Sequence, residues 1–146
     1  IKADYITTSV SSSANMASYS GLSAKLTAVL EYAAKFLGVP YVYGGSTPSG
    51  FDCSGFTSYV YKNTVCSIER VAQAQFDTTT RVSRDELLPG DLVFFGSSAY
   101  SISHVGIYVG DGQFIHAPHT GDVVKYDSLS GSYATRFQGG GRVIFD

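Results

Sequence analysis

Apolar positions recur at helical spacing early in the chain. Between residues 23 and 37 they stand three or four positions apart, which places them on one face of a helix that covers a core. We expect Ser23 to cap this helix, and Gly38 followed by Pro40 to end it. The apolar face comprises Leu26, Val29, Leu30, Ala33, Ala34 and Leu37.

A second helix is predicted to begin at Cys53. Asp52 can cap its first turn, and an apolar face that includes Val60 continues to about Asn63. The next segment, 64–80, favours a short helix or turn that carries polar side chains. Cys53 therefore belongs to the first turn of a helix.

Hydrophobic alternation and turn residues dominate the second half of the chain. A turn is expected at 87–91 and a polar loop at 97–103. The clearest hairpin turns at Gly110-Asp111-Gly112. Strands are predicted at 92–95, 104–109, 113–117, 123–127 and 142–145.

The length of the hairpin loop decides where its two histidines point. With a three-residue loop at 110–112, position 109 pairs with 113, 107 with 115 and 106 with 116. His104 and His116 then share one face of the sheet as diagonal neighbours. A two-residue loop would shift the register by one and send the two imidazoles to opposite faces. A histidine pair is therefore predicted only with the three-residue loop.

Length and charge limit the classes of function. The 146 residues suit one domain, with residues 1–20 as a Ser/Thr-rich linker or N-terminal arm and 21–146 as the domain proper. A net charge of −2 without a basic run makes nucleic acid an unexpected partner. The sequence contains no run of 18 apolar residues, so no membrane span is predicted. Ile1 opens no signal peptide, which fits a processed form or an excised domain.

Cys53 is the candidate nucleophile. At a helix start, free backbone N–H groups and the helix dipole favour the thiolate over the thiol. His104 is then a candidate base, and His116 a candidate group to hold that imidazole in the correct tautomer. The alternative is that Cys53 is only a small buried apolar residue. A disulfide with Cys66 is not expected, because Cys66 lies beyond the far end of the predicted helix.

The same residues could also serve other kinds of site. Cys53, His104, His116 and His119 could form a four-ligand zinc site, but no CxxC or HExxH spacing supports it, so no metal or other cofactor is expected. His119 follows a proline in a polar loop and is expected to have no role in the site. The glycines of the 41–50 loop either let the backbone approach something closely, or belong to a plain loop on which Tyr41 packs.

Five short segments resemble the NlpC/P60 family in order and spacing. They are 40–45, 52–56, 88–95, 104–110 and 114–117, and the resemblance covers about residues 22–146. It implies a reduced papain-like α+β fold, in which N-terminal helices pack on an antiparallel β-sheet. It also implies a cell-wall cysteine endopeptidase that cuts peptidoglycan stem peptides between D-γ-glutamate and the following diamino acid.

The resemblance also assigns roles to individual residues. It makes Cys53 the nucleophile, His104 the base and His116 the third polar residue. Tyr41 would lie beside the oxyanion hole, with the Cys53 backbone N–H as a donor. The remaining implied substrate-binding residues are Asp52 and Ser54, which would hold a substrate amine, and Arg70 and Gln75, which match the family's segment after the catalytic helix.

The resemblance further implies a secreted or cell-wall-associated bacterial protein, in which residues 1–20 follow a wall-binding or glycan-cutting domain. Two alternatives remain open. One is a related thiol amidase or acyltransferase, because a triad specifies acyl transfer whereas the groove specifies the acyl group. The other is a catalytically silent wall-binding module.

Overall fold

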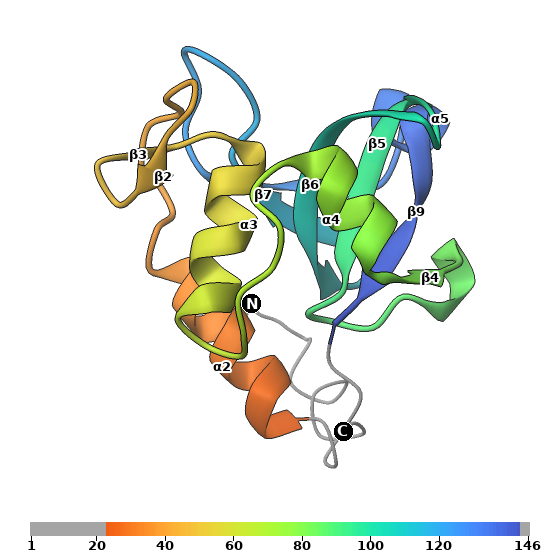
Figure 1. Ribbon diagram of the computed structural model, residues 1–146, viewed down its shortest axis with the longest axis horizontal. Helices are drawn as coiled ribbons and strands as arrows, with labels where there is room; N and C mark the ends of the chain where they lie inside the picture. The colour runs from red at the N-terminus through yellow and green to blue at the C-terminus, as the bar shows by residue number, and fades with distance from the viewer. Residues whose placement is uncertain (1–22, 144–146) are drawn as a thin grey trace.

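The computed structural model describes residues 23–143, so the predicted linker at 1–20 and the end of the predicted strand at 142–145 lie outside the described residues. Helices come first along the chain and strands dominate its second half (Figure 1). In chain order the elements are α2 (Ser23–Ala34), β2 (Ser46–Thr47), β3 (Gly50–Phe51), α3 (Cys53–Lys62), α4 (Ala72–Thr78), β4 (Thr80–Val82), the 3-10 helix η1 (Arg84–Glu86), β5 (Leu92–Ser98), β6 (Ser101–Gly110), β7 (Gln113–His116), β8 (Lys125–Ser128), α5 (Ser132–Arg136) and β9 (Phe137–Arg142).

Six strands form one antiparallel sheet in the order β4-β9-β5-β6-β7-β8. Helices α2 and α3 stand on one side of this sheet, with α4 near α3 and α5 at the far end of the strands (Figure 1). The predicted α+β class is therefore confirmed. No helix among the described residues is both long and apolar enough to span a membrane.

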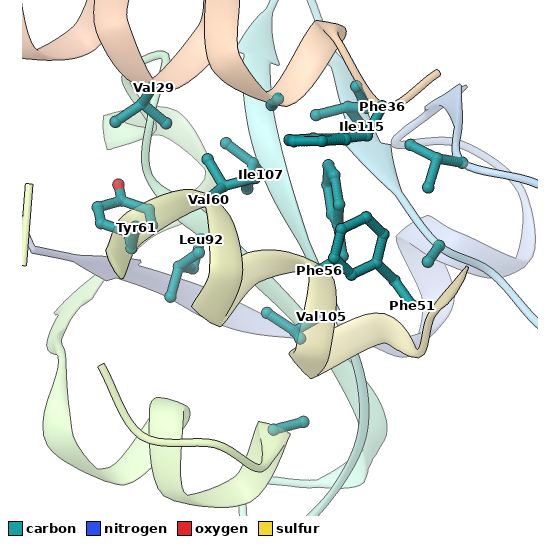
Figure 2. Close-up of a cluster of buried hydrophobic side chains, with 14 of the residues drawn as sticks. Val29, Phe36, Phe51, Phe56, Val60, Tyr61, Leu92, Val105, Ile107 and Ile115 are labelled. Atoms are coloured by element: carbon teal, nitrogen blue, oxygen red, sulfur yellow. The ribbon is translucent and has the colours of Figure 1, made fainter. Parts of the chain in front are cut away.

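The main core fills the space between the helices and the sheet. Val29 of α2, Val60 of α3 and Ile107 of β6 are completely buried and converge there (Figure 2). Burying each such aliphatic side chain stabilises the fold by ~1.5–3 kcal/mol. This packing fixes α3, and with it the start of α3, against β6.

Helix α2 confirms most of the predicted apolar face but ends early. Leu26, Val29 and Ala33 are buried as expected, whereas Leu37 is 42% exposed. The helix ends at Ala34, because a turn follows and Gly38 adopts a φ of +89°. Leu37 therefore lies outside the helical face. Ser23 is the first described residue of this helix, and the predicted cap is not tested by the described residues.

The β6–β7 hairpin has the predicted register near the histidines, but its loop is shorter than predicted. Ile107 pairs with Ile115 as expected, but Gly110 pairs with Gln113, so the loop contains two residues and not three. The register shift between Tyr108 and Gly110 is a β-bulge, whose extra residue compensates for the shorter loop. The predicted pairing of 109 with 113 is wrong, yet both histidines keep the predicted face.

Other strand boundaries also differ from the sequence predictions. The expected loop at 97–103 is mostly strand, because β5 continues to Ser98 and β6 begins at Ser101. The last strand begins at Phe137, five residues before the predicted start, and includes the glycine run 139–141. A β-carbon on Gly141 would lie 2.2 Å from the Thr79 hydroxyl oxygen. The Thr79 side chain therefore packs so closely on β9 that only glycine fits at position 141.

Candidate active site

Cys53 is the first residue of α3, as predicted. Asp52 caps the helix, because its carboxylate Oδ1 accepts a hydrogen bond from the Gly55 backbone N–H at 2.7 Å. The partly buried Cys53 packs against the main core, and its thiol interacts with the backbone of Val105. The start of α3 thus places the Cys53 sulfur beside Val105 of β6, the residue that follows His104.

The environment of Cys53 favours the thiol, contrary to the expectation of a stabilised thiolate. Burial raises the pKa of Cys53 and is the largest effect; hydrogen bonding by the backbone of Val105 opposes it, and the nearby Asp52 charge raises the pKa further. Desolvation thus outweighs the free N–H groups of the helix start. A base must therefore remove the thiol proton for Cys53 to attack.

His104 and His116 form the pair that the hairpin predicted. His104 Nε2 lies 2.7 Å from His116 Nδ1, and both side chains are buried. The rings meet edge to face, with centroids 4.9 Å apart. This contact uses Nε2 of His104, so Nδ1 is the nitrogen that remains for a proton from Cys53.

Asp127 extends the pair to a third side chain, which sequence reasoning missed. Its Oδ2 lies 2.7 Å from His116 Nε2. In the β7–β8 pairing, Asp127 faces Phe114, and His116 is the diagonal neighbour on the same face. The predicted strand at 123–127 contained Asp127, but the register across the loop at 117–124 could not be derived from the sequence.

Both histidines are held neutral. Burial is the largest cause that lowers the pKa of His104 from 6.5 to about 3, and protonation of the neighbouring His116 would oppose a second positive charge on His104 as well. Burial also lowers the pKa of His116, although the hydrogen bond and charge of Asp127 act in the opposite direction. A neutral imidazole can accept a proton, so His104 is chemically suited to the role of base.

Helix α5 was not predicted, and it covers the histidines from the side of β5. The Tyr133 ring packs against both imidazoles, with centroids 6.5 Å from His104 and 5.6 Å from His116. Arg136 donates a hydrogen bond to the Ser103 hydroxyl at 3.0 Å. The five-residue helix is too short for hydrophobic periodicity to reveal it. It helps to bury the pair and so contributes to the lowered pKa values.

Asp52, Ser54 and Arg70 form a connected cluster beside Cys53. Arg70 donates to both carboxylate oxygens of Asp52, at 3.0 and 3.1 Å, and to the Ser54 hydroxyl at 2.9 Å. The Gly44 backbone N–H also donates to Asp52 at 3.1 Å. With the bond from Gly55, these contacts fill the lone pairs of the carboxylate. A substrate amine would have to displace one of these partners, and the half-exposed Arg70 is the most accessible.

Tyr41 and the paired glycines shape the other side of the Cys53 turn. A thiolate at Cys53 would raise the pKa of Tyr41, second to burial, which places the two groups near each other. A β-carbon on Gly45 would lie 2.4 Å from the Gly50 carbonyl oxygen, and one on Gly55 would lie 2.0 Å from the Gly45 carbonyl oxygen. The glycines thus permit a close approach between segments of the protein itself.

Gln75, for which substrate binding was expected, lies in the core. Its side chain has no exposed surface. Its amide NH₂ donates to the carbonyl oxygens of Ser54 at 3.2 Å and Glu69 at 2.8 Å, and its Oε1 accepts from the Thr57 hydroxyl at 2.8 Å. Gln75 therefore ties the first turn of α3 to the segment that carries Arg70.

The remaining candidate residues take no part in the contacts between His104, His116 and Asp127. His119 is 71% exposed, and its Nδ1 bonds with the backbone of Thr120. Cys66 is exposed, and neither it nor Cys53 is in a disulfide. Within residues 23–143, no group of three or more His, Cys, Asp or Glu side chains is arranged to hold a metal ion.

Comparison with known proteins gives consistent matches. A sequence profile of the NlpC/P60 family matches residues 38–142. The chain is 49% identical to a Listeria innocua protein named "Probable endopeptidase p60", over 80% of this chain and 24% of that protein. It is 40% identical to the Bacillus subtilis bifunctional muramidase/DL-endopeptidase CwlT, over 72% of this chain and 32% of that protein. The chain thus spans about a quarter to a third of these relatives.

A solved structure supports the same relationship. The NlpC/p60 domain of the peptidoglycan hydrolase SagA superposes with a TM-score of 0.73 and 39% sequence identity. The match covers 81% of this chain and 98% of that one, so the two folds correspond over almost the whole solved domain.

Proposed function

Because the chain belongs to the NlpC/P60 family, we propose that it is a cysteine endopeptidase that hydrolyses bacterial peptidoglycan stem peptides. The bond we assign is that between D-γ-glutamate and the diamino acid, in line with the DL-endopeptidase named among its relatives. The observation that carries the proposal is the arrangement around Cys53. A helix-start thiol meets β6 beside a buried, neutral histidine that a second histidine orients.

In the first step, His104 Nδ1 takes the proton of the Cys53 thiol while the sulfur attacks the carbonyl carbon of the scissile amide. A C–S bond forms, and the carbonyl π electrons move onto oxygen. The backbone N–H of Cys53 donates to this oxyanion, with Tyr41 beside it. The protonated His104 then gives its proton to the leaving amine as the C–N bond breaks, which leaves a thioester on Cys53.

Water completes the cycle. His104 takes a proton from a water molecule, the resulting hydroxide oxygen attacks the thioester carbonyl, and collapse of the intermediate breaks the C–S bond. The thiolate recovers its proton from His104, and the new carboxylic acid leaves and releases its proton to the solvent. The enzyme returns to a neutral thiol and a neutral imidazole, which is the state that the pKa directions of both groups favour.

The cluster beside Cys53 supplies the proposed recognition of the stem peptide. Asp52 and Ser54 attract the free amine of an N-terminal L-Ala, with Arg70 shifting aside to release one carboxylate lone pair. Stem peptides with a free or an acetylated L-Ala amine test this role. Equal kcat/KM values for the two peptides would mean that Asp52 and Ser54 do not bind the free amine.

The setting of the domain is also part of the proposal. We place it in a secreted or cell-wall-associated bacterial protein, as the peptidoglycan substrate requires. Its relatives are several times longer than the matched region, so the domain is proposed to act beside wall-binding or glycan-cutting domains.

Product mapping on purified muropeptides tests the function. Muropeptides with diaminopimelate or lysine at the third position are incubated with the wild-type chain and with Cys53→Ala, and the fragments are weighed by mass spectrometry. The proposal predicts cleavage after D-γ-glutamate by the wild type only. Cleavage at a D-D peptide bond or at the glycan-lactyl amide would reject the assigned bond, and no cleavage of any muropeptide would reject the function.

A further inference from the structure

His104, His116 and Asp127 form a continuous chain of side-chain contacts. His104 Nε2 contacts His116 Nδ1, and His116 Nε2 contacts the Asp127 carboxylate, with both distances at 2.7 Å. His116 has no exposed surface, whereas the Asp127 side chain is 31% exposed. This chain of contacts therefore runs from the partly exposed Asp127 carboxylate into the core.

The chemistry of a carboxylate fixes every proton along this chain of contacts. An ionised carboxylate can only accept hydrogen bonds, so His116 Nε2 must carry a hydrogen. In a neutral imidazole the other nitrogen is then bare, so His116 Nδ1 must accept from His104 Nε2–H. By the same rule, His104 Nδ1 carries no hydrogen. That nitrogen is the one that must accept the Cys53 proton.

We propose that Asp127 is a positioning residue that sets the tautomers of both histidines and keeps His104 Nδ1 free to accept the Cys53 proton. This inference rests on the proposed function for the identity of the reaction, but its structural content concerns only the protons of the histidines. Without an acceptor at 127, His116 can reverse its tautomer. His104 would then accept at Nε2, carry its hydrogen on Nδ1 and be unable to act as base.

The other charged and titratable groups around the pair do not provide a second anchor of this kind. Lys125 on β8 and Asp122 in the preceding loop affect His116 through their charges, and Arg136 of α5 and His119 affect His104 in the same way. The Tyr133 ring packs on both imidazoles. Within residues 23–143, His116 Nε2 is hydrogen-bonded to Asp127, so the carboxylate is the group that determines the proton position.

The tautomer assignment requires a neutral His116, and the surroundings of His116 favour that state. Burial lowers the pKa of His116 and outweighs the opposing influence of Asp127. If His116 became protonated at both nitrogens, it would donate to His104 Nε2 and reverse the tautomer of His104. Acid should therefore inactivate the site through His116 as well as through His104.

The test combines a spectrum with a rate. Nitrogen-15 NMR of the imidazoles distinguishes bare from protonated ring nitrogens in the whole chain, for the wild type, Asp127→Ala and Asp127→Glu. Glu31→Gln serves as the control, because it removes one exposed negative charge from α2. The wild type and Glu31→Gln should both show bare Nδ1 on His104 and on His116. Asp127→Ala should show mixed or reversed tautomers, and Asp127→Glu should restore at least part of the wild-type pattern.

The rate should follow the tautomer. Loss of one charge-assisted hydrogen bond predicts a fall in kcat/KM of roughly 10- to 100-fold for Asp127→Ala, chiefly in kcat, with partial rescue by Asp127→Glu. Unchanged histidine spectra in Asp127→Ala would overturn the inference even if the wild type cleaves peptidoglycan. A wild type that cleaves no muropeptide, yet shows the tautomer change, would overturn the proposed function and leave the role of Asp127 intact.

Discussion

Replacement of Gln75 by glutamate separates a structural role from a substrate-binding role. The change preserves the size of the side chain and its acceptor for the Thr57 hydroxyl. It removes the NH₂ group that donates to the Ser54 and Glu69 carbonyl oxygens. Because the site is completely buried, no water replaces the lost donor at low cost.

The expected magnitude follows from these two bonds. A buried carbonyl left without its donor costs ~1–3 kcal/mol. Two such carbonyls, with a carboxyl group that must be buried either charged or protonated, predict a loss of about 2–5 kcal/mol in the free energy of unfolding. A domain of this size is stable by only ~5–15 kcal/mol, so the change removes a large part of the total.

Urea denaturation followed by circular dichroism measures this loss. The midpoint for Gln75→Glu should fall by roughly 1–3 M urea relative to the wild type. Gln113→Glu is the matched control, because it makes the same chemical change at an exposed position of β7, where a shift within ~0.5 kcal/mol is expected.

The KM for stem peptides distinguishes the two roles of Gln75. If Gln75→Glu kept the wild-type midpoint but raised KM for stem peptides, then Gln75 would contact substrate and the buried network would not hold the first turn of α3. A loss of stability with unchanged KM in the folded fraction agrees with the structural role.

Three further predictions follow from the hairpin, the histidines and the Cys53 turn. Deletion of Val109 removes the bulge and should retain activity, whereas deletion of Asp111 should shift the register of His104 against β7 and abolish hydrolysis. Because His104 stays neutral to about pH 3 in the native state but protonates near 6.5 when unfolded, the free energy of unfolding should fall by ~1.4 kcal/mol per pH unit as the pH falls from 6.5 to about 3. Denaturation curves of His104→Gln should show a shallower slope; an equal slope would contradict the assigned pKa. Gly55→Ala places a β-carbon 2.0 Å from the Gly45 carbonyl oxygen, so both the melting temperature and kcat/KM should fall, and unchanged values would contradict the close approach.

The sequence predicted the parts of the site that depend on local rules. Capping by Asp52 placed Cys53 in a first helical turn, and alternation placed His104 and His116 on one face. The loop length was wrong, yet the register was right at positions 107 and 115, because a bulge and a shorter loop compensate. Such compensation is not visible in a hydrophobic pattern, which records faces and not hydrogen-bond pairs.

The missed parts depend on long-range packing. Asp127 reaches His116 only through the β7–β8 register, and Tyr133 only through the placement of α5 over β5. The pKa of Cys53 was predicted from the helix start alone, whereas burial against the core decides its direction. The same packing moved Gln75 from the expected substrate groove into the core.

Trapping the acyl-enzyme shows directly whether Cys53 is the nucleophile. The wild-type chain is mixed with a muropeptide, quenched in acid within the first turnover, digested and analysed by peptide mass spectrometry. A thioester of the stem-peptide acyl fragment should form on Cys53, with no adduct on the exposed Cys66, and Cys53→Ala should show neither adduct nor hydrolysis. An adduct on Cys66, or hydrolysis by Cys53→Ala above about a tenth of the wild-type rate, would contradict Cys53 as the nucleophile.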